Sequence, residues 1–242
     1  MCTVTFIPAK EAVYITHNRD EKKLRARAVP PQLYTIKNFQ LVFPRDGHAG
    51  GSWIALHQNG GAAVLLNGAF TKHQHQPPYR KSRGLAFLDI LTGSDLFLSY
   101  QQISLEAIEP FTVILWTGTA LYECRWDGTQ KHIKSLDALQ SYSWSSATLY
   151  DADVIEKRNN WFTTWLQQHP QPAMEDIINF HLFGGEGDAH NDLRMNRDGI
   201  TLTVSITALK IQPYIGLMQY LDLQDNNSYQ QALSFKNAAL TQ

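Results

Sequence analysis

A cysteine and a charged pair near the start of the chain could do chemistry together. Cys2 directly follows Met1, and Arg19-Asp20 comes shortly afterwards. Removal of Met1 would leave residue 2 with both a thiol and an α-amine whose ordinary pKa is about 7.7–8.0. Such an amine can act as a general base at neutral pH. A neighbouring cation such as Arg19 favours the thiolate, and Asp20 could orient the ammonium form. These residues could form an N-terminal nucleophile, but taken alone they fit a small strand residue beside a surface ion pair better.

Two apolar runs explain how these groups would meet. Residues 4–7 and 12–15 are separated by the turn residues 8–11, which is typical of neighbouring strands. If the strands pair antiparallel, the end of the second returns to the start of the first. We therefore expect Arg19 and Asp20 to lie beside Cys2.

Four stretches make the chain resemble the NRDE family, whose members are transport and Golgi organisation protein 2-like. They are Met1-Cys2, Asn18-Arg19-Asp20-Glu21, Gly50-Gly51-Ser52-Trp53-Ile54 and Leu65-Leu66-Asn67. That family resembles the N-terminal nucleophile hydrolases, and among them the penicillin V acylase and bile salt hydrolase group. The resemblance implies an α+β fold, a four-layer αββα sandwich, in one domain over residues 1–242. It also implies hydrolysis of a linear amide (C–N) or related acyl bond in a small-molecule substrate, without a cofactor.

The resemblance implies further site residues. Asn67 matches the family's strand end and would hold an oxyanion together with a backbone N–H, whereas Asn67-Gly68 alone predicts a turn. Ser146 stands where the family has an asparagine, which leaves a shorter hydrogen-bonding arm. Arg197 is the candidate for an arginine that precedes a Ser/Thr-rich strand, with Arg194 second. The candidate substrate-binding residues are Asn18, Trp53 and Trp144.

Composition excludes several classes of protein. The net charge is −1 and the basic residues are spread along all 242 residues, which argues against nucleic acid as a partner. The two cysteines, Cys2 and Cys124, fit a reducing compartment rather than a disulfide framework. We expect Cys124 to be an inert core thiol. No secretory signal is evident, and the longest apolar stretch, residues 111–116, is too short to cross a bilayer. The sequence predicts a cytoplasmic protein without stable membrane insertion.

Periodicity and turn residues predict the remaining elements. Expected helices span residues 82–93, 95–102, 151–168 and 173–183. Expected strands span residues 39–43, 52–57, 62–66, 111–116, 120–126, 131–134, 201–207, 210–215 and 216–223. Residues 62–66 are apolar throughout, so this strand should be covered on both faces. The basic residues 22–27, closed by Pro30-Pro31, predict an exposed loop that would border the site, and residues 225–242 predict a loop and a short terminal helix.

Some features leave alternatives open. His73-x-His75 lacks a third ligand at a usable spacing, so no metal site is expected. Residues 184–188 are either a lid or a linker. The aromatic stripe of Trp161, Phe162 and Trp165 is expected to pack in the core, with a hydrophobic-ligand site as the alternative.

Two alternatives to a hydrolase function remain open from the sequence. Because the resemblance also implies haem or lipid-related trafficking, the chain could bind haem or another hydrophobic ligand, with Cys2 as a ligand or a relic. The other is a relic of a hydrolase that binds nothing.

Overall fold

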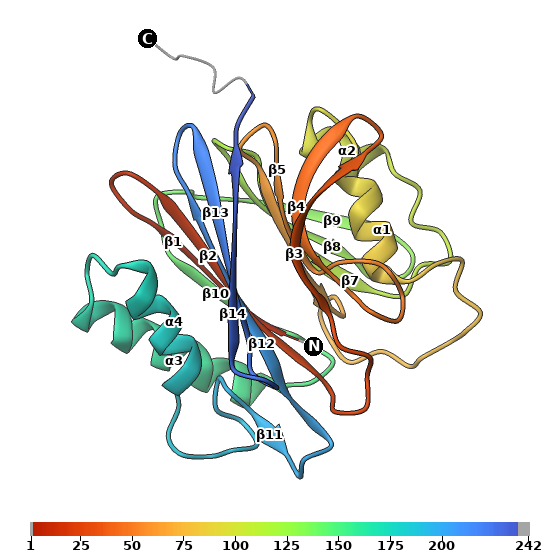
Figure 1. The fold of residues 1–242 in the computed structure, drawn as a ribbon. Helices are drawn as coiled ribbons and strands as arrows, with labels where there is room; N and C mark the ends of the chain where they lie inside the picture. The colour runs from red at the N-terminus through yellow and green to blue at the C-terminus, as the bar shows by residue number, and fades with distance from the viewer. Residues whose placement is uncertain (1, 237–242) are drawn as a thin grey trace.

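Two antiparallel sheets of seven strands each pack face to face, with helices on both outer faces (Figure 1). The computed structural model describes residues 2–236, with side chains from residue 3 onward. In the first sheet the strands run in the order β10 (Tyr142–Ser145), β1 (Cys2–Pro8), β2 (Val13–Lys22), β12 (Thr201–Ile211), β13 (Ile215–Asp222) and β14 (Asn227–Ser234), with β11 (Asn196–Arg197) beside β12. In the second they run β3 (Val29–Ile36), β4 (Phe39–Arg45), β5 (Ile54–His57), β6 (Ala62–Asn67), β7 (Phe111–Trp116), β8 (Leu121–Trp126) and β9 (Lys131–Leu136).

Helices complete the four layers that the sequence predicts. Helices α3 (Ala152–Gln168) and α4 (Met174–Phe183) lie on the first sheet, and α1 (Arg83–Ile90) and α2 (Leu96–Gln102) lie on the second (Figure 1). Three of them begin where the sequence predicts, and the side chains of Ser82, Asp95 and Asp151 cap them by accepting a hydrogen bond from a backbone N–H in the first turn. No helix within residues 2–236 is long and apolar enough to span a membrane.

The pairing of β1 with β2 is the one that the apolar runs predict. The strands are antiparallel, with Pro8 opposite Val13 and Cys2 opposite Arg19. On its other edge β2 pairs with β12, so it lies inside the first sheet. The expectation that Arg19 returns to Cys2 is therefore confirmed at the level of the backbone.

Side chains of β2 alternate between two different environments. Tyr14 belongs to the apolar cluster under α3 and α4, whereas Ile15 belongs to the cluster between the sheets. Because successive residues of a strand point to opposite faces, Arg19 faces the second sheet and Asp20 faces the helices. The two charged residues thus approach the start of β1 from opposite sides.

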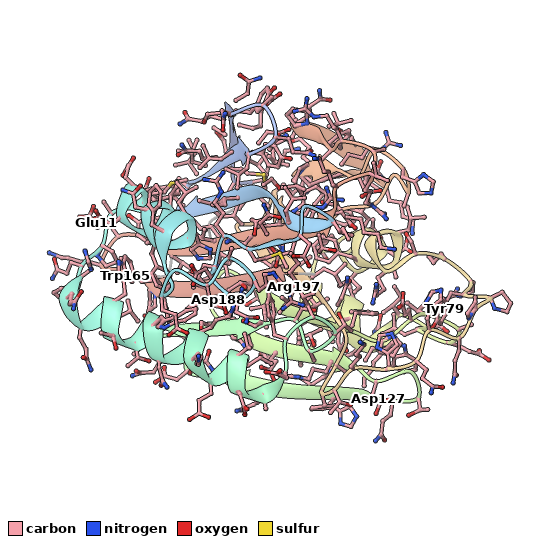
Figure 2. The ribbon with its side chains drawn as sticks, turned by 90° about the horizontal axis from the view of Figure 1, so that it is seen from below. Glu11, Tyr79, Asp127, Trp165, Asp188 and Arg197 are labelled. Atoms are coloured by element: carbon pink, nitrogen blue, oxygen red, sulfur yellow. The ribbon has the colours of Figure 1, made fainter. Side chains whose placement is uncertain are left out.

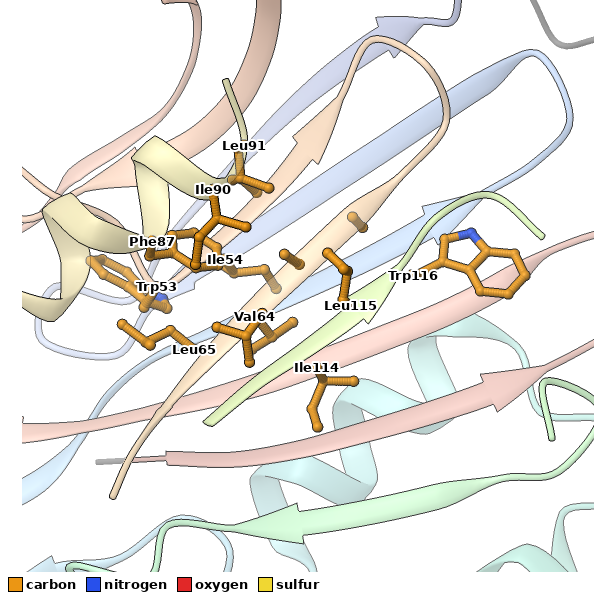
Figure 3. Close-up of a cluster of buried hydrophobic side chains, with 14 of the residues drawn as sticks. Trp53, Ile54, Val64, Leu65, Phe87, Ile90, Leu91, Ile114, Leu115 and Trp116 are labelled. Atoms are coloured by element: carbon orange, nitrogen blue, oxygen red, sulfur yellow. The ribbon is translucent and has the colours of Figure 1, made fainter. Parts of the chain in front are cut away.

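The larger apolar cluster fills the space between the sheets and beneath α1. Strands β6 and β7 are buried on both faces, as expected from their continuous apolar sequence. Figure 3 shows Phe87 and Ile90 of α1 beside Ile54 and Val64 of the sheet. The aromatic stripe of α3 packs in the smaller cluster, where Trp165 stacks on Phe180 with ring centroids 4.8 Å apart. This confirms its expected role in packing.

Several stretches differ from the predicted elements; β10 and β11 were not predicted, and three others differ in extent or type. β12 continues to Ile211, so the predicted break after residue 207 does not occur. Residues 227–234 pair with β13 and form strand β14, whereas the sequence predicted a loop and a helix here. The prediction failed because this edge strand is polar and mostly exposed, so its sequence lacks a clear apolar alternation. Residues 237–242 lie outside the described part. β3 starts at Val29 and runs through both prolines, which an edge strand tolerates because one side of its ladder is unpaired.

A buried histidine connects α4 to both N-terminal strands. Asn18 Nδ2 donates to the carbonyls of His181 and Leu193 at 3.0 and 2.7 Å. Asn18 Oδ1 is therefore the acceptor at 2.7 Å from His181 Nδ1, so that nitrogen carries the proton. His181 Nε2 then accepts from Thr5 Oγ1 at 2.8 Å. Burial, assisted by the charge of Arg158, lowers the pKa of His181 to about 3, so the ring is neutral in the folded protein.

This neutral histidine makes folding sensitive to acid. In the unfolded chain its pKa is about 6.5, so below that value only the unfolded state gains a proton, and stability falls until the pH reaches the folded pKa. The expected loss is about 2 kcal/mol between pH 7 and pH 5 for this residue. We predict that His181→Asn, which keeps a donor toward Asn18, reduces the pH dependence of the urea unfolding free energy by about that amount.

His48→Asn, at an exposed loop position, is the matched control and should leave the pH dependence unchanged. An equal pH dependence in the wild type and His181→Asn would contradict the assignment.

Candidate functional site

A pocket of about 270 Å³ opens beside the end of β2, between that strand, β6, the loop after β4 and the start of α1. We call it the charged pocket. Its wall contains Trp53 and Asn67 together with equal numbers of basic and acidic side chains, namely Arg19, Arg25, Arg83, Glu21, Asp46 and Glu109. Arg25 belongs to the basic loop, so the expectation that this loop borders the site is confirmed.

Arg19 is held in the pocket wall by two fixed contacts. Its guanidinium donates to Asp46 Oδ2 at 2.5 Å and lies 4.1 Å above the ring of Trp53. The side chain is only 7% exposed, so the ion pair is weakly screened by water. The strand register sets residue 2 opposite this arginine, which gives residue 2 a fixed cation as its neighbour.

Asp46 organises the loop that supplies this ion pair. It also accepts from Arg25 Nε and Nη2, at 2.9 and 3.1 Å, and from the backbone N–H groups of His48 and Ala49. Burial by itself raises the pKa of Asp46, but these hydrogen bonds and the charge of Arg19 lower it further than burial raises it. Asp46 is therefore an ionised partner for Arg19.

Glycines let this loop approach α1. A Cβ added to Gly51 would lie 2.4 Å from the carbonyl carbon of Gly84, and Gly50 has a φ of +71°. The Gly50-Gly51-Ser52 part of the sequence pattern thus serves the packing of the loop, and Trp53 after it supplies the ring under Arg19.

Asn67 stands between the charged pocket and a second one. It is half-buried at the end of β6 and also lines a pocket of about 240 Å³, which we call the Trp144 pocket. No group in residues 3–236 hydrogen-bonds its side-chain amide. Its backbone carbonyl accepts from Ser146 Oγ at 2.8 Å. Ser146 is buried and lines neither pocket, so it holds the strand end of Asn67 in place.

The Trp144 pocket has fewer charged side chains in its wall than the charged pocket. The indole N–H of Trp144 donates to Glu123 at 2.7 Å, and Ser143 Oγ donates to Asn159 at 2.6 Å, so these polar groups already have partners. A neighbouring pocket of about 400 Å³ shares Phe70, Ala147 and Ile155 with it. Together they form a groove of mixed polarity that leads away from Asn67 and carries the apolar side chains Phe70, Ala147 and Ile155.

Asp20 lies on the other face of β2 and is fully buried. Its Oδ2 accepts from the Tyr150 hydroxyl at 2.8 Å, and its Oδ1 accepts from Thr203 Oγ1 at 2.6 Å. Burial raises the pKa of Asp20, although the charge of Arg158 and both hydroxyl donors oppose this rise. Arg158 stacks on the Tyr150 ring at 3.6 Å.

Neither Tyr150 nor Arg158 was given a role in the predictions from sequence. The available signal was a charged residue at an inward position of α3, between Ile155 and Phe162. A buried arginine needs several acceptors, and nothing in the local sequence shows where they are.

Two further predicted site residues, like Asp20 and Ser146, line neither pocket. Arg197 donates to the carbonyls of His190 and Leu149 and to Asn191 Oδ1, near the Asp188 loop (Figure 2). Its guanidinium is 5.4 Å from the Tyr150 ring. Asn18 is occupied by the His181 contacts on the helix face.

Of the predicted site residues, the structure brings Arg19, Trp53 and Asn67 together around the charged pocket. Trp144 lies with Asn67 around the Trp144 pocket.

His73, His75 and Cys124 have other roles. Glu109 Oε1 lies 3.0 Å from His73 Nε2 and 3.4 Å from His75 Nδ1, so both histidines bind the carboxylate in the pocket wall. Within residues 2–236 no group of His, Cys, Asp and Glu has the arrangement of a metal site. Cys124 is buried in β8, and burial raises its pKa to about 12, which makes it unreactive at neutral pH.

Comparison of the sequence with family models gives a match over residues 1–202 to Transport and Golgi organisation 2. The chain belongs to this family. No curated protein matches the sequence.

Solved structures share the fold. A mutant of conjugated bile acid hydrolase from Clostridium perfringens has a TM-score of 0.61 at 8% identity, over 98% of this chain and 97% of that one. A second variant of that hydrolase gives 0.57 at 8% identity with the same coverage. A Caenorhabditis elegans N-acylethanolamine-hydrolyzing acid amidase ortholog gives 0.53 at 10% identity, over 86% and 92% of the two chains. The chain therefore has the fold of the N-terminal nucleophile hydrolases.

We predict that Asp46→Asn destabilises the protein by about 3 kcal/mol, because it leaves the buried Arg19 without its counter-charge. Arg25→Gln removes a partner that is 34% exposed and should cost less than about 1 kcal/mol. Urea unfolding of both variants measures the difference. Equal losses would show that Arg19 does not depend on the Asp46 charge.

Proposed function

We propose that this member of the Transport and Golgi organisation 2 family is an N-terminal cysteine hydrolase that cleaves a linear amide or related acyl bond. The observation that carries the proposal is the β1–β2 register, which sets residue 2 opposite Arg19 beside the charged pocket. The hydrolytic names of the proteins that share the fold support it.

The reaction begins with removal of Met1, which frees the α-amine of Cys2. That amine accepts the thiol proton, and the thiolate attacks the substrate carbonyl carbon. The Asn67 side-chain amide, which has no other described partner, donates to the oxyanion together with a backbone N–H. The ammonium then protonates the leaving nitrogen as the C–N bond breaks. Water hydrolyses the acyl-thioester, which releases a carboxylic acid and restores the thiol.

The two charged neighbours act from opposite sides of β2. Arg19 is a fixed cation on the pocket side and favours the thiolate form of Cys2. Asp20, on the helix side, holds the ammonium form between the two proton transfers. No metal or cofactor takes part in these steps.

The two walls beside Asn67 indicate the shape of the substrate. The charged pocket offers paired cations and anions, which suit a compact polar group that both donates and accepts hydrogen bonds. The groove of Phe70, Ala147 and Ile155 suits an extended apolar group. An amide that joins these two kinds of group would place its carbonyl near Asn67.

Haem or hydrophobic-ligand binding is the other function expected from the sequence. This function is an outcome of the tests below rather than a second proposal. Retained Met1, an unreactive Cys2 and saturable haem binding would establish it instead.

The first test is chemical reactivity. The intact mass of the purified protein should lack Met1, and iodoacetamide should modify Cys2 much faster than the buried Cys124. Hydrolysis of chromogenic N-acyl amides should be abolished in Cys2→Ala and retained in Cys124→Ala, the matched control. Hydrolysis that survives Cys2→Ala would refute the proposal.

A second test addresses the oxyanion. Asn67→Ala should lower kcat by about 100-fold to 1,000-fold with little change in KM, the loss typical of one oxyanion donor. Ser146→Ala keeps the Asn67 amide but removes the hydrogen bond to its carbonyl, so its effect should be about tenfold or less. A larger loss in Ser146→Ala than in Asn67→Ala would assign the oxyanion contact to Ser146.

A further inference from the structure

Asp20 is held by a cluster of buried side chains on the helix side of β2. Both of its carboxylate oxygens accept from hydroxyl groups, Oδ2 from Tyr150 and Oδ1 from Thr203. Thr203 Oγ1 itself accepts from the backbone N–H of Met195 at 2.9 Å, which directs its proton toward Asp20. Two donors on one carboxylate favour its ionised form and fix its plane.

Arg158 connects this carboxylate to the start of β1. Its guanidinium stacks on the Tyr150 ring at 3.6 Å and donates through Nη1 to Thr3 Oγ1. Its Nε and Nη2 donate to the carbonyls of Asn191 and Asp192 at 3.0 and 2.7 Å. Arg158 is 1% exposed, so its position is fixed. It connects α3 to Thr3, the neighbour of Cys2, and to the Tyr150 ring, whose hydroxyl binds Asp20.

We infer that Tyr150 and Arg158 are positioning residues for the N-terminal nucleophile. Tyr150 orients the Asp20 carboxylate toward the α-amine of Cys2, and Arg158 fixes both Tyr150 and Thr3. This inference rests on the proposed function, but it concerns how residue 2 is held and not which bond is cleaved. Arg158 lines none of the pockets described above, and Tyr150 lines the 400 Å³ pocket of the groove but neither the charged pocket nor the Trp144 pocket, which meet at Asn67.

Arg158 takes the place that the sequence analysis gave to Arg197. The Arg197 guanidinium is farther from the Tyr150 ring, at 5.4 Å. Its hydrogen bonds go to the carbonyls of His190 and Leu149 and to the Asn191 side chain, and none goes to Asp20 or Thr3. Among the described residues, the charged or titratable groups that face Asp20 are Arg158 from α3 and Tyr150 from the segment before it.

Tyr150→Phe tests the inference in the full-length processed protein. Loss of the hydroxyl should lower kcat about tenfold or more with KM unchanged. Because Asp20 loses a donor to its ionised form, the acid limb of the pH–rate profile should move to higher pH by about one unit. Arg158→Gln should move it in the same direction, and the charge-conserving Arg158→Lys should restore most of the wild-type profile.

Tyr100→Phe is the matched control. Tyr100 is also fully buried and its hydroxyl has no partner among the described residues, but it lies on α2 beside the other sheet. This variant should leave kcat and the pH profile unchanged. A purely structural role for Tyr150 would lower the urea midpoint without moving the acid limb, and that result would overturn the inference.

The rate of Cys2 alkylation against pH gives a readout that does not need turnover. If the wild type hydrolyses nothing but Tyr150→Phe shifts the alkylation profile of Cys2, the hydrolase proposal fails and the positioning role stands. If hydrolysis occurs and Tyr150→Phe changes neither profile, the positioning role fails and the hydrolase proposal stands.

Discussion

The alternation of side chains along β2 is the constraint on which the candidate site depends. One strand carries Arg19 toward the second sheet and Asp20 toward the helices, so the start of β1 has a cation on one side and a carboxylate on the other. Each side needs its own support. The loop after β4 supplies Asp46 to Arg19, and the segment around α3 supplies Tyr150 and Arg158 to Asp20. Both sheets and the layer of α3 and α4 are therefore needed to build a site around one residue.

Buried charge explains why these supports are so extensive. An ion taken out of water is costly unless its counter-charge and hydrogen bonds are fixed in place. Arg19 and Asp46 satisfy each other directly. Asp20 and Arg158 form no direct hydrogen bond, so each is satisfied by neutral groups and by Tyr150 between them. Such a network stabilises one arrangement of the strands and helices, because a shift of any element would leave a charge without a partner.

The sequence predicted the parts of the site that depend on local signals. The return of Arg19 to Cys2 follows from two short apolar runs and a turn, and the starts of α1, α2 and α3 follow from signals within those segments. The support of Asp20 could not be predicted in this way. Thr203 and Tyr150 are 183 and 130 residues away in sequence, and no local pattern specifies such pairs.

The same distinction explains the errors in the predicted elements. Strand β14 exposes most of its polar side chains at the sheet edge, so its pattern does not differ from that of a loop. The prolines of β3 indicate a loop from sequence, and only the edge position of that strand makes them acceptable.

A chain terminus suits a site of this kind for a physical reason. In the interior of a strand, the backbone nitrogen is committed to the ladder and only the side chain can do chemistry. At a free N-terminus the α-amine is a base with a pKa close to neutral, and it belongs to the same residue as the nucleophile. Removal of Met1 would place that amine at residue 2, opposite Arg19 and next to Thr3, which Arg158 holds. The anion that Asp20 presents on the helix side is then the natural partner for the ammonium, while Arg19 on the pocket side favours the thiolate. The separation of the two charges by the sheet keeps them from neutralising each other, so each can act on a different group of one residue.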